Sequence, residues 1–322
     1  MTQYAVFSRA VVTIYDLPAP TKQDDEGQTL STIGDEGLYG QVCRVVAPAA
    51  PLPAGVAEVY TFYGYHGYVY TADLLPLSDA ALSAYLAADL VTVCRATDVM
   101  SLPRVSAVRL AELEAGGILR RRAQSDVPAG WAAVELADGR TGYTRDVALE
   151  PVRCPMTAVR RYDGKMRFDE ALAAAEGCAP ADLVPRALAR WHGGSEEAFR
   201  NAVCAEAERF MGTEYRWGGK SGRGIDCSGL VSTAYLRSGV LIYRDAKLVE
   251  GWPMRQIPFE QKKRGDALYF PGHIALYLGE GRYIHSTGAA ASGGVVLNSL
   301  DPSDPLYRAD LVESLYAVGS IF

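Results

Sequence analysis

The sequence has few of the residues that most often identify a chemistry. It contains four histidines and six cysteines in 322 residues, and neither a CxxC pair nor an HExxH segment occurs. These absences exclude a structural zinc site, a thioredoxin-type redox pair and a zinc protease. Six cysteines are also too dilute for a disulfide scaffold. We therefore expect no metal and no cofactor, and cysteines that are mostly small buried hydrophobes.

An excess of positive charge and long hydrophobic runs are lacking too. The 32 Lys and Arg against 38 Asp and Glu give a net charge of −6, which argues against nucleic acid as a partner. No apolar run is long enough to span a membrane. The first residues lack the cationic start and apolar core of a secretory signal. We expect a cytoplasmic protein if Met1 is the native start, and a secreted or cell-wall protein if a signal peptide has been removed.

Several nucleotide and hydrolase motifs fail on inspection. Lys220 and Ser221 follow Gly218-Gly219, as in a phosphate-binding loop, but Glu214 stands where that loop requires its first glycine. No GxSxG occurs, and no GxGxxG follows a predicted strand. Phosphate-loop, serine-hydrolase and dinucleotide-binding functions are therefore excluded.

The first 150 residues indicate two similar β units. Tyrosine outnumbers the other aromatic residues, with 19 Tyr against 8 Phe and 4 Trp, and residues 60–70 predict a strand, a tight turn and a strand. Residues 67–76 resemble 142–151, and the β-branched run at 11–15 matches the run at 90–94. We expect small β-barrels over 1–79 and 80–150, joined by a short helix with Ser78 as its N-cap.

From residue 151 the pattern changes to helices followed by a hairpin. Helices are predicted over 169–176, from Ser195 onward, and over 227–239. Strands over 273–278 and 282–286 flank a glycine-rich turn. This order predicts an α+β domain over 151–322.

One cysteine and two histidines are the candidates for chemistry. Cys227 follows a glycine-rich loop and starts a predicted helix, where the N-terminus stabilises a thiolate. A thiolate nucleophile also needs a positioned imidazole. His273 and His285 have the same parity on the predicted hairpin, so both side chains face one side, and His273 can act as base with His285 on its other ring nitrogen. A lone cysteine at a helix start is also typical of a structural cysteine, and a histidine pair on a hairpin is also typical of surface histidines. We expect the other two histidines, His66 and His192, to be structural.

Five segments resemble, in order and spacing, the signature of NlpC-type papain-like murein peptidases: YRWGG at 215–219, GIDCSGLV at 224–231, RGDALYF at 264–270, GHIALYLG at 272–279 and YIHS at 283–286. The resemblance covers residues 195–322 and implies a papain-like fold. It implies Cys227 as the nucleophile, His273 as general base and then acid, and His285 as the orienting third residue. It also places Tyr215 beside the oxyanion, with the backbone N–H groups of Cys227 and Ser228 as further donors.

The first 150 residues resemble the paired bacterial SH3-like domains of three-domain members that cleave γ-D-glutamyl-diamino-acid bonds. The resemblance rests on the segments around Tyr68 and Tyr143. In those members the first SH3-like domain caps the cleft and helps to hold a free L-Ala amine. The resemblance implies a set of substrate-binding residues: Tyr65, Asp245, Asp226, Arg244 and Gln41. Gln41 stands where a Glu is expected, so it supplies a hydrogen bond without a charge.

The expected protein is a papain-like cysteine endopeptidase preceded by two small SH3-like β-barrels. Its expected substrate is a murein peptide, L-Ala-γ-D-Glu-diamino acid, cut after D-Glu, with meso-diaminopimelate or Lys as the diamino acid. One alternative is a murein amidase or D-amino-acid endopeptidase that acts on intact cell wall. Another is a wall-binding protein with an inert third domain, although an intact Cys227, His273 and His285 set speaks against it.

Overall fold

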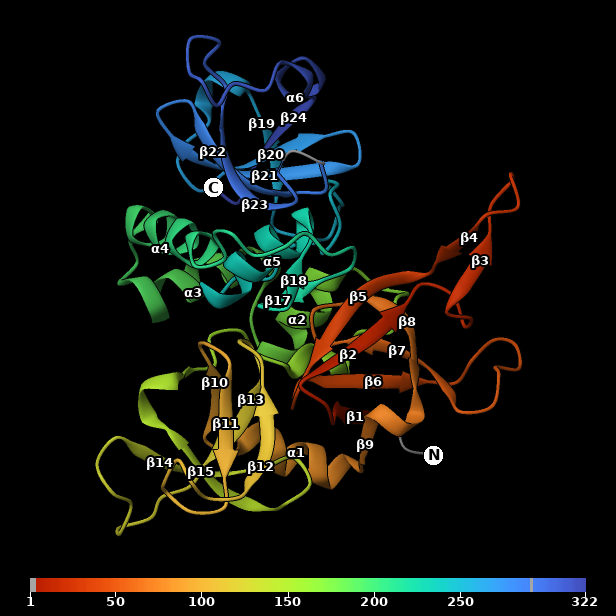
Figure 1. Ribbon diagram of the computed structural model, residues 1–322, viewed down its shortest axis with the longest axis vertical. Helices are drawn as coiled ribbons and strands as arrows, with labels where there is room; N and C mark the ends of the chain where they lie inside the picture. The colour runs from red at the N-terminus through yellow and green to blue at the C-terminus, as the bar shows by residue number, and fades with distance from the viewer. Residues whose placement is uncertain (1–3, 290–291) are drawn as a thin grey trace. The chain divides into compact units, whose positions relative to one another are not determined.

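The computed structural model describes residues 4–289 and 292–322 and divides into two compact units (Figure 1). The first unit extends to Gly164, and the second runs from Lys165 to Phe322. The sequence predicts a boundary at residue 151, with a linker before the peptidase domain, and this boundary stays a prediction. The segment after 151 stays with the first unit because the Tyr162 ring packs edge-on against Tyr60, and its carbonyl accepts a hydrogen bond from Arg44.

The first β module, residues 4–77, is a seven-stranded antiparallel sheet in the order β5-β2-β8-β7-β6-β1-β9. Its strands are β1 (Tyr4–Phe7), β2 (Val11–Tyr15), β5 (Ile33–Leu38), β6 (Val42–Val46), β7 (Val56–Thr61), β8 (His66–Tyr70) and β9 (Leu74–Leu77). Side chains from β1, β2, β6, β7 and β8, among them Phe7, Ile14 and Val59, share one buried cluster. The sheet therefore rolls around its own core. A two-stranded arm, β3 (Thr21–Gln23) and β4 (Thr29–Ser31), projects from it (Figure 1).

The second β module, residues 90–151, repeats this arrangement in the order β12-β11-β15-β14-β13-β10-β16. Its strands are β10 (Leu90–Val93), β11 (Thr97–Met100), β12 (Arg109–Leu113), β13 (Ile118–Arg121), β14 (Trp131–Glu135), β15 (Thr141–Arg145) and β16 (Leu149–Pro151). The repeat of 67–76 at 142–151 is confirmed, since β8 and β15 hold the same place in the two sheets. The match of 11–15 with 90–94 is wrong, because β10 holds the place of β1. The β-branched composition of a segment indicates a buried strand, but it does not indicate where in the sheet that strand lies.

The two β modules are joined by one helix and one inserted turn. Helix α1 (Asp79–Ala87) starts as predicted, with the Ser78 hydroxyl accepting from the N–H of Ala81 at 3.2 Å. The turn after β5 carries Tyr39, whose ring lies in the core of the second module. The Tyr39 carbonyl accepts from the N–H of Ile118 at 2.7 Å. The modules therefore share a core and hydrogen bonds.

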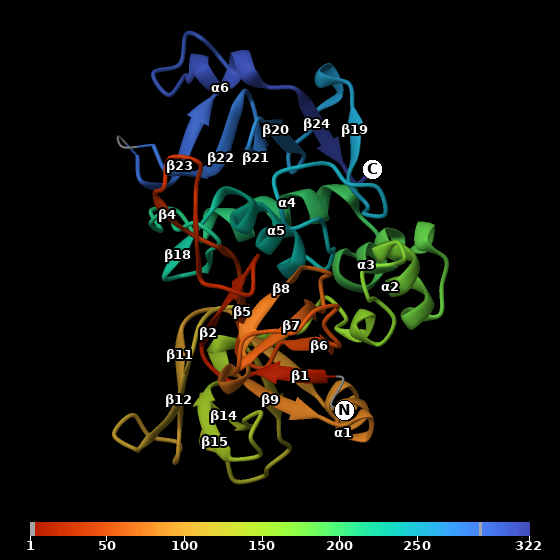
Figure 2. The same ribbon diagram turned by 90° about the vertical axis from the view of Figure 1, so that its right-hand side faces the viewer.

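The second unit packs helices against a six-stranded antiparallel sheet in the order β19-β24-β20-β21-β22-β23. Its sheet strands are β19 (Arg255–Ile257), β20 (Ala267–Phe270), β21 (His273–Gly279), β22 (Arg282–Thr287), β23 (Gly294–Ser299) and β24 (Ala317–Ser320). Its helices are α2 (Phe168–Glu176), α3 (Leu183–His192), α4 (Glu196–Glu208), α5 (Cys227–Arg237) and α6 (Ala309–Ser314). Helices α4 and α5 lie side by side in both views (Figures 1 and 2), and residues of α5, β21 and β22 share one core cluster.

Local sequence signals place most of these helix ends. Gly177 ends α2 in the left-handed conformation at φ 62°, and the Ser195 hydroxyl caps α4. Helix α3 was not predicted, and it carries Pro185 in its first turn. Proline is tolerated there because the first turn has no intrahelical partner for its missing N–H.

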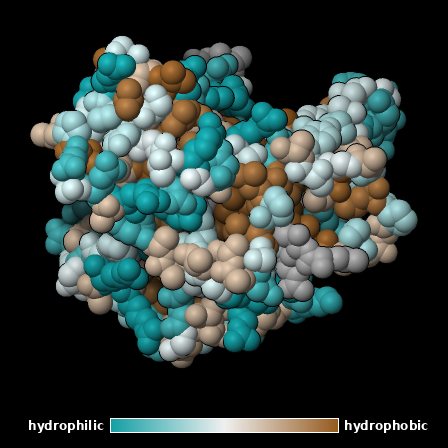
Figure 3. Space-filling view, turned by 90° about the horizontal axis from the view of Figure 1, so that it is seen from below, coloured by the Kyte–Doolittle hydropathy of each residue, from teal (hydrophilic) through white to brown (hydrophobic). Residues whose placement is uncertain are grey.

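The surface shows no extended apolar band on the face drawn in Figure 3, where hydrophilic side chains predominate and hydrophobic ones gather in a few patches. Among the most exposed large hydrophobic side chains are Val105, Val108 and Val147. Within the described residues, no helix has the length and apolar character needed to cross a membrane.

Candidate active site

Cys227 is the first residue of helix α5 and is 6% exposed. Asp226 caps the helix, and its carboxylate accepts from the N–H of Gly229 at 2.6 Å. The short hairpin β17 (Lys220–Ser221) and β18 (Gly224–Ile225) leads into this turn. A Cβ at position 229 would lie 2.2 Å from the Gly219 carbonyl oxygen, so only glycine fits there. The loop and the helix start therefore approach each other as closely as backbones can.

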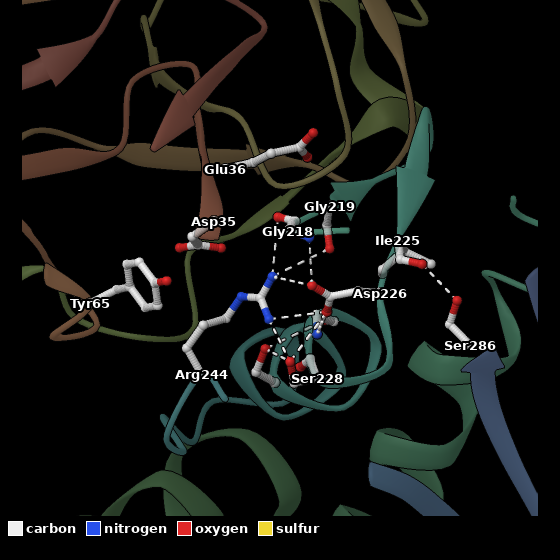
Figure 4. Close-up of polar contacts among 12 residues, drawn as sticks. Asp35, Glu36, Tyr65, Gly218, Gly219, Ile225, Asp226, Ser228, Arg244 and Ser286 are labelled. Carbon is white, nitrogen blue, oxygen red and sulfur yellow. Dashed lines mark hydrogen bonds and ion pairs between the residues drawn. The ribbon is translucent and has the colours of Figure 1, made fainter. Parts of the chain in front are cut away.

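A buried ion pair fixes the turn that carries Cys227 (Figure 4). Arg244, 3% exposed, donates to both carboxylate oxygens of Asp226 at 3.1 Å each. It also donates to the Ser228 hydroxyl at 2.7 Å and to the Gly218 carbonyl at 3.1 Å. The second oxygen of Asp226 accepts from the N–H of Gly218 at 2.9 Å. The buried charges of Asp226 and Arg244 are thus paired with each other. Their hydrogen bonds reach Gly218 before Cys227 and Ser228 after it.

A hydrogen bond ties this turn to the strand that carries His285. The Ser286 hydroxyl on β22 donates to the carbonyl of Ile225 at 2.6 Å (Figure 4). Ile225 and Ser286 are both fully buried. The start of α5 and strand β22 are therefore held at a fixed distance, although they are separated by about sixty residues of chain.

His273 and His285 meet across the β21–β22 hairpin. Nε2 of His273 lies 2.7 Å from Nδ1 of His285, which confirms that the two side chains share one face of the sheet. Nε2 of His285 lies 2.8 Å from the carboxamide oxygen of Asn298 on β23. The Cys227 thiol also belongs to this group, since the N–H of Ile274, next to His273, hydrogen bonds to it.

The protonation of the three groups is governed mainly by burial. Burial and, to a smaller extent, the charge of Asp226 raise the pKa of the Cys227 thiol to about 11, although the N–H groups of Ile274 and Ser228 and the charge of Arg244 act in the opposite direction. Burial lowers the pKa of His273 to about 3, with His285 and Arg308 acting in the same direction. Burial likewise lowers the pKa of His285 to about 4.

The favoured resting form at neutral pH is therefore a thiol beside two neutral imidazoles. The helix N-terminus favours a thiolate, as the sequence predicts for Cys227, but burial and the Asp226 carboxylate shift the pKa of its thiol in the opposite direction. A neutral imidazole can accept the thiol proton as the sulfur attacks.

Tyr215 lies close enough to Cys227 and Asp226 for their charges to act on it. Burial raises the pKa of its phenol to about 12, and the charges of Cys227 and Asp226 raise it as well. The phenol is therefore neutral at physiological pH and keeps an O–H donor. Its backbone is fixed by a hydrogen bond from its N–H to the Gly293 carbonyl at 2.8 Å.

The predicted substrate-binding residues have different environments. Asp226 and Arg244 bind each other in the nucleophile turn, and the substrate contacts expected of them stay predictions. Gln41 is 2% exposed, and its carboxamide accepts from the N–H of Leu38 and donates to the Gly116 carbonyl. The substrate role expected for Gln41 is corrected, because both ends of the carboxamide serve the junction of the two β modules.

Tyr65 and Asp245 are half-buried, in the first and second units respectively. The Tyr65 hydroxyl donates to Asp16 at 2.7 Å. Asp245 directly follows Arg244, and its carbonyl accepts from the N–H of Lys247 at 2.8 Å. The expected substrate contacts of Tyr65 and Asp245 stay predictions.

Sequence reasoning missed Asn298. The chain has only two asparagines, Asn201 and Asn298, and Asn298 stands two residues beyond Val296, which pairs with His285. That parity places it on the same face of the sheet as His285, but the strand β23 had not been predicted. Across residues 4–289 and 292–322, no group of three or more His, Cys, Asp or Glu side chains is arranged to hold a metal ion.

Comparison with known proteins agrees with this geometry. The profile of the NlpC/P60 family matches residues 212–306, which include Cys227, His273, His285 and Asn298. Dipeptidyl-peptidase 6 of Lysinibacillus sphaericus is 38% identical over 293 residues, which cover 89% of this chain and 92% of that protein. Fold and family together define a papain-like cysteine peptidase. The chain belongs to the NlpC/P60 family.

Two further comparisons bear on the fold and on part of the chain. A solved NlpC/P60 family protein from Bacillus cereus ATCC 10987 has a TM-score of 0.64 over 98% of both chains at 17% identity, which shows a shared fold. The γ-D-glutamyl-L-lysine dipeptidyl-peptidase of Bacillus subtilis strain 168 is 32% identical over 139 residues, or 41% of this chain and 43% of that protein. The predicted α+β class with a papain-like C-terminal domain is confirmed.

Proposed function

We propose that this protein is an endopeptidase that cuts the γ-D-glutamyl-diamino-acid bond of murein peptides with a free N-terminal L-Ala. The observation that carries the proposal is the 38% identity to dipeptidyl-peptidase 6, because that similarity extends over both units. The similarity to a γ-D-glutamyl-L-lysine dipeptidyl-peptidase supports the nature of the bond. Removal of a dipeptide from the N-terminus of such a peptide releases L-Ala-D-Glu.

Cys227 is the proposed nucleophile. Its sulfur attacks the γ-carbonyl carbon of D-Glu while His273 accepts the thiol proton, which suits the neutral resting form of both groups. The carbonyl oxygen becomes an oxyanion, for which the Tyr215 hydroxyl and the N–H groups at the start of α5 are the proposed donors. The ion pair of Asp226 and Arg244 keeps this turn in place.

The protonated His273 then acts as the general acid. It gives its proton to the amine nitrogen of the diamino acid as the C–N bond breaks, which leaves a thioester on Cys227. Water attacks the thioester with His273 as base, and the thiol is restored as the dipeptide leaves. Throughout this cycle His285 holds the other ring nitrogen of His273, at 2.7 Å.

Recognition of the free amine is proposed for Tyr65 and Asp245. A buried ammonium requires a carboxylate and further hydrogen-bond acceptors, and these two residues offer an acidic group and a hydroxyl. A peptide that is still attached to glycan, or acetylated at L-Ala, has no such ammonium. The proposal therefore predicts a preference for free peptides over intact cell wall.

The test is digestion of free L-Ala-γ-D-Glu-Lys, its meso-diaminopimelate counterpart and intact sacculus side by side, with products identified by mass. We expect L-Ala-D-Glu from at least one free peptide and no release from sacculus. Comparison of the two tripeptides also identifies the diamino acid. Efficient release of fragments from sacculus would instead favour the alternative of a murein amidase or D-amino-acid endopeptidase. No cleavage of any of the three would favour an inert wall-binding protein.

A further inference from the structure

Asn298 is held in one orientation by the loop that follows its strand. Its carboxamide nitrogen donates to the Leu306 carbonyl at 2.8 Å, and that carbonyl also accepts from the N–H of Ser299 at 3.0 Å. A carbonyl oxygen can only accept, so the carboxamide nitrogen must face Leu306. The carboxamide oxygen is then the atom that faces Nε2 of His285, at 2.8 Å.

This orientation determines where the protons of both imidazoles lie. An oxygen acceptor at Nε2 of His285 requires a proton on that nitrogen, and a neutral imidazole carries only one proton. Nδ1 of His285 is therefore an acceptor. Since it lies 2.7 Å from Nε2 of His273, the proton of His273 must be on Nε2. Nδ1 of His273 is left with a lone pair.

We propose that Asn298 is a positioning residue that fixes the tautomers of His285 and His273, so that Nδ1 of His273 is the atom that takes the Cys227 proton. The opposite tautomer would be inactive, because a proton already on Nδ1 of His273 leaves no lone pair for the thiol proton. The kinetic part of this inference rests on the proposed peptidase function. The tautomer part does not.

Two substitutions separate this role from a purely structural one. Asn298→Leu removes both the oxygen that faces His285 and the nitrogen that bonds Leu306. Asn298→Asp also loses the donor to Leu306, but it keeps an acceptor for Nε2 of His285. A residue that only held the loop would be damaged equally by both substitutions. A residue that fixes the tautomers is damaged mainly by the leucine.

The kinetic experiment measures kcat and KM on the free tripeptide. We expect Asn298→Leu to lower kcat about three- to tenfold, which is the population shift that one net hydrogen bond produces. KM should be unchanged, and Asn298→Asp should recover most of the loss. The matched control is Asn201→Leu, since Asn201 is exposed on α4, where its carboxamide oxygen accepts from Nε of Arg264 at 3.1 Å.

The tautomers are read directly from the ¹⁵N shifts of the imidazole rings in the full chain. Only four histidines are present, so His66→Gln and His192→Gln leave the signals of His273 and His285 to be assigned. We expect Nε2–H on both rings in the wild type and partial Nδ1–H in Asn298→Leu. Nδ1–H in the wild type would overturn the proposal, even if Asn298→Leu failed to fold. Equal kcat losses in the Leu and Asp variants would overturn it as well. A wild type that cleaves no peptide would count against the proposed function alone, because the ring signals still test the tautomers.

Discussion

The two compact units bury charge in different ways. The second unit contains buried acid–base pairs, which are Asp226 with Arg244, Glu206 with Arg237, and Asp266 with Arg200. In the described part of the first unit, the buried charged side chains are all acids, namely Asp35, Glu36 and Glu114. The second unit therefore uses opposite charges to hold its own segments together, and one of the three pairs lies in the nucleophile turn. The buried charged side chains of the first unit are thus of one sign, whereas the second unit buries both signs.

The largest effect is expected at the nucleophile. Cys227→Ala should reduce hydrolysis of the free tripeptide by more than about a thousandfold, since no other group replaces the thiol. Its melting temperature should stay close to that of the wild type. The control is Cys204→Ala, where a buried thiol on α4 belongs to the core, so stability falls and activity per folded molecule stays. Activity that survives in Cys227→Ala would show that Cys227 is not the nucleophile.

Substitution of His273 should lower kcat more than substitution of His285. His273→Ala removes both the base and the acid and should cost nearly as much kcat as the loss of Cys227. His285→Gln should cost less, because a side-chain amide oxygen can still accept from Nε2 of His273. Steady-state kinetics of the two variants test the ranking. Equal losses would mean that the roles are assigned wrongly.

The contrast in buried charge is tested by removing one arginine from each unit. Arg244→Met leaves the Asp226 carboxylate buried without its partner, which costs about 3–5 kcal/mol of unfolding free energy. Arg121→Met breaks an exposed pair with Asp146 in the second β module and should cost about 1 kcal/mol or less. Urea unfolding of both variants measures the difference. Similar losses would show that burial does not make the Asp226–Arg244 pair more important for stability than an exposed pair.

The proposed ammonium site should contribute a smaller, substrate-specific effect. A charge-assisted hydrogen bond is worth about 1.5–3 kcal/mol, so Asp245→Asn should lower kcat/KM on the free-amine peptide roughly ten- to a hundredfold. The N-acetylated peptide should be cut poorly by both proteins, with little further loss. Tyr65→Phe should lose less than Asp245→Asn, and the matched Tyr143→Phe in the second β module should lose nothing. Equal cleavage of free and acetylated peptides would end the proposal of an amine site.

The last prediction is a pH dependence of stability. The folded pKa values of His273 and His285 are about 3 and 4, below the ordinary 6.5, so the unfolded chain binds more protons once the pH falls below 6.5. Stability is therefore lost as the pH falls from 6.5 towards 4. From pH 7 to 5 each histidine should contribute about 2 kcal/mol of this loss. The unfolding free energy of His285→Gln should fall less steeply with pH than that of the wild type, and parallel curves would contradict the shifts.

The parts of the fold that short-range signals encode were predictable from the sequence. Ser78 and Ser195 cap their helices, Gly177 ends α2, and the parity of 273 and 285 brought two histidines to one face of a sheet. Each of these depends on a few neighbouring residues, and the rules for caps and strand parity are local.

What sequence reasoning missed depends on contacts between distant segments. Gln41 was expected to bind substrate in place of a Glu, yet its carboxamide is buried against Gly116 of the other β module. The contact of Asn298 with His285 depends on the pairing of β23 with β22, and β23 had not been predicted. The thiol at a helix start was expected to ionise, because the depth of its burial is not visible in the sequence. Contacts between segments distant in the sequence decided all three.

The turn at Tyr39 has a consequence for how such a chain can be recombined. The Tyr39 ring lies in the core of the second β module, and its hydroxyl accepts from the N–H of Ala137 at 2.9 Å. The hydroxyl of Tyr85 on α1 donates to the Gly40 carbonyl at 2.7 Å. A chimaera that exchanged only one β module would leave a tyrosine without its pocket, or a pocket without its tyrosine. The pair of β modules is therefore the unit that can be exchanged between proteins of this kind. Gene fusions that preserve function are expected to join the chain before or after the pair, never inside it.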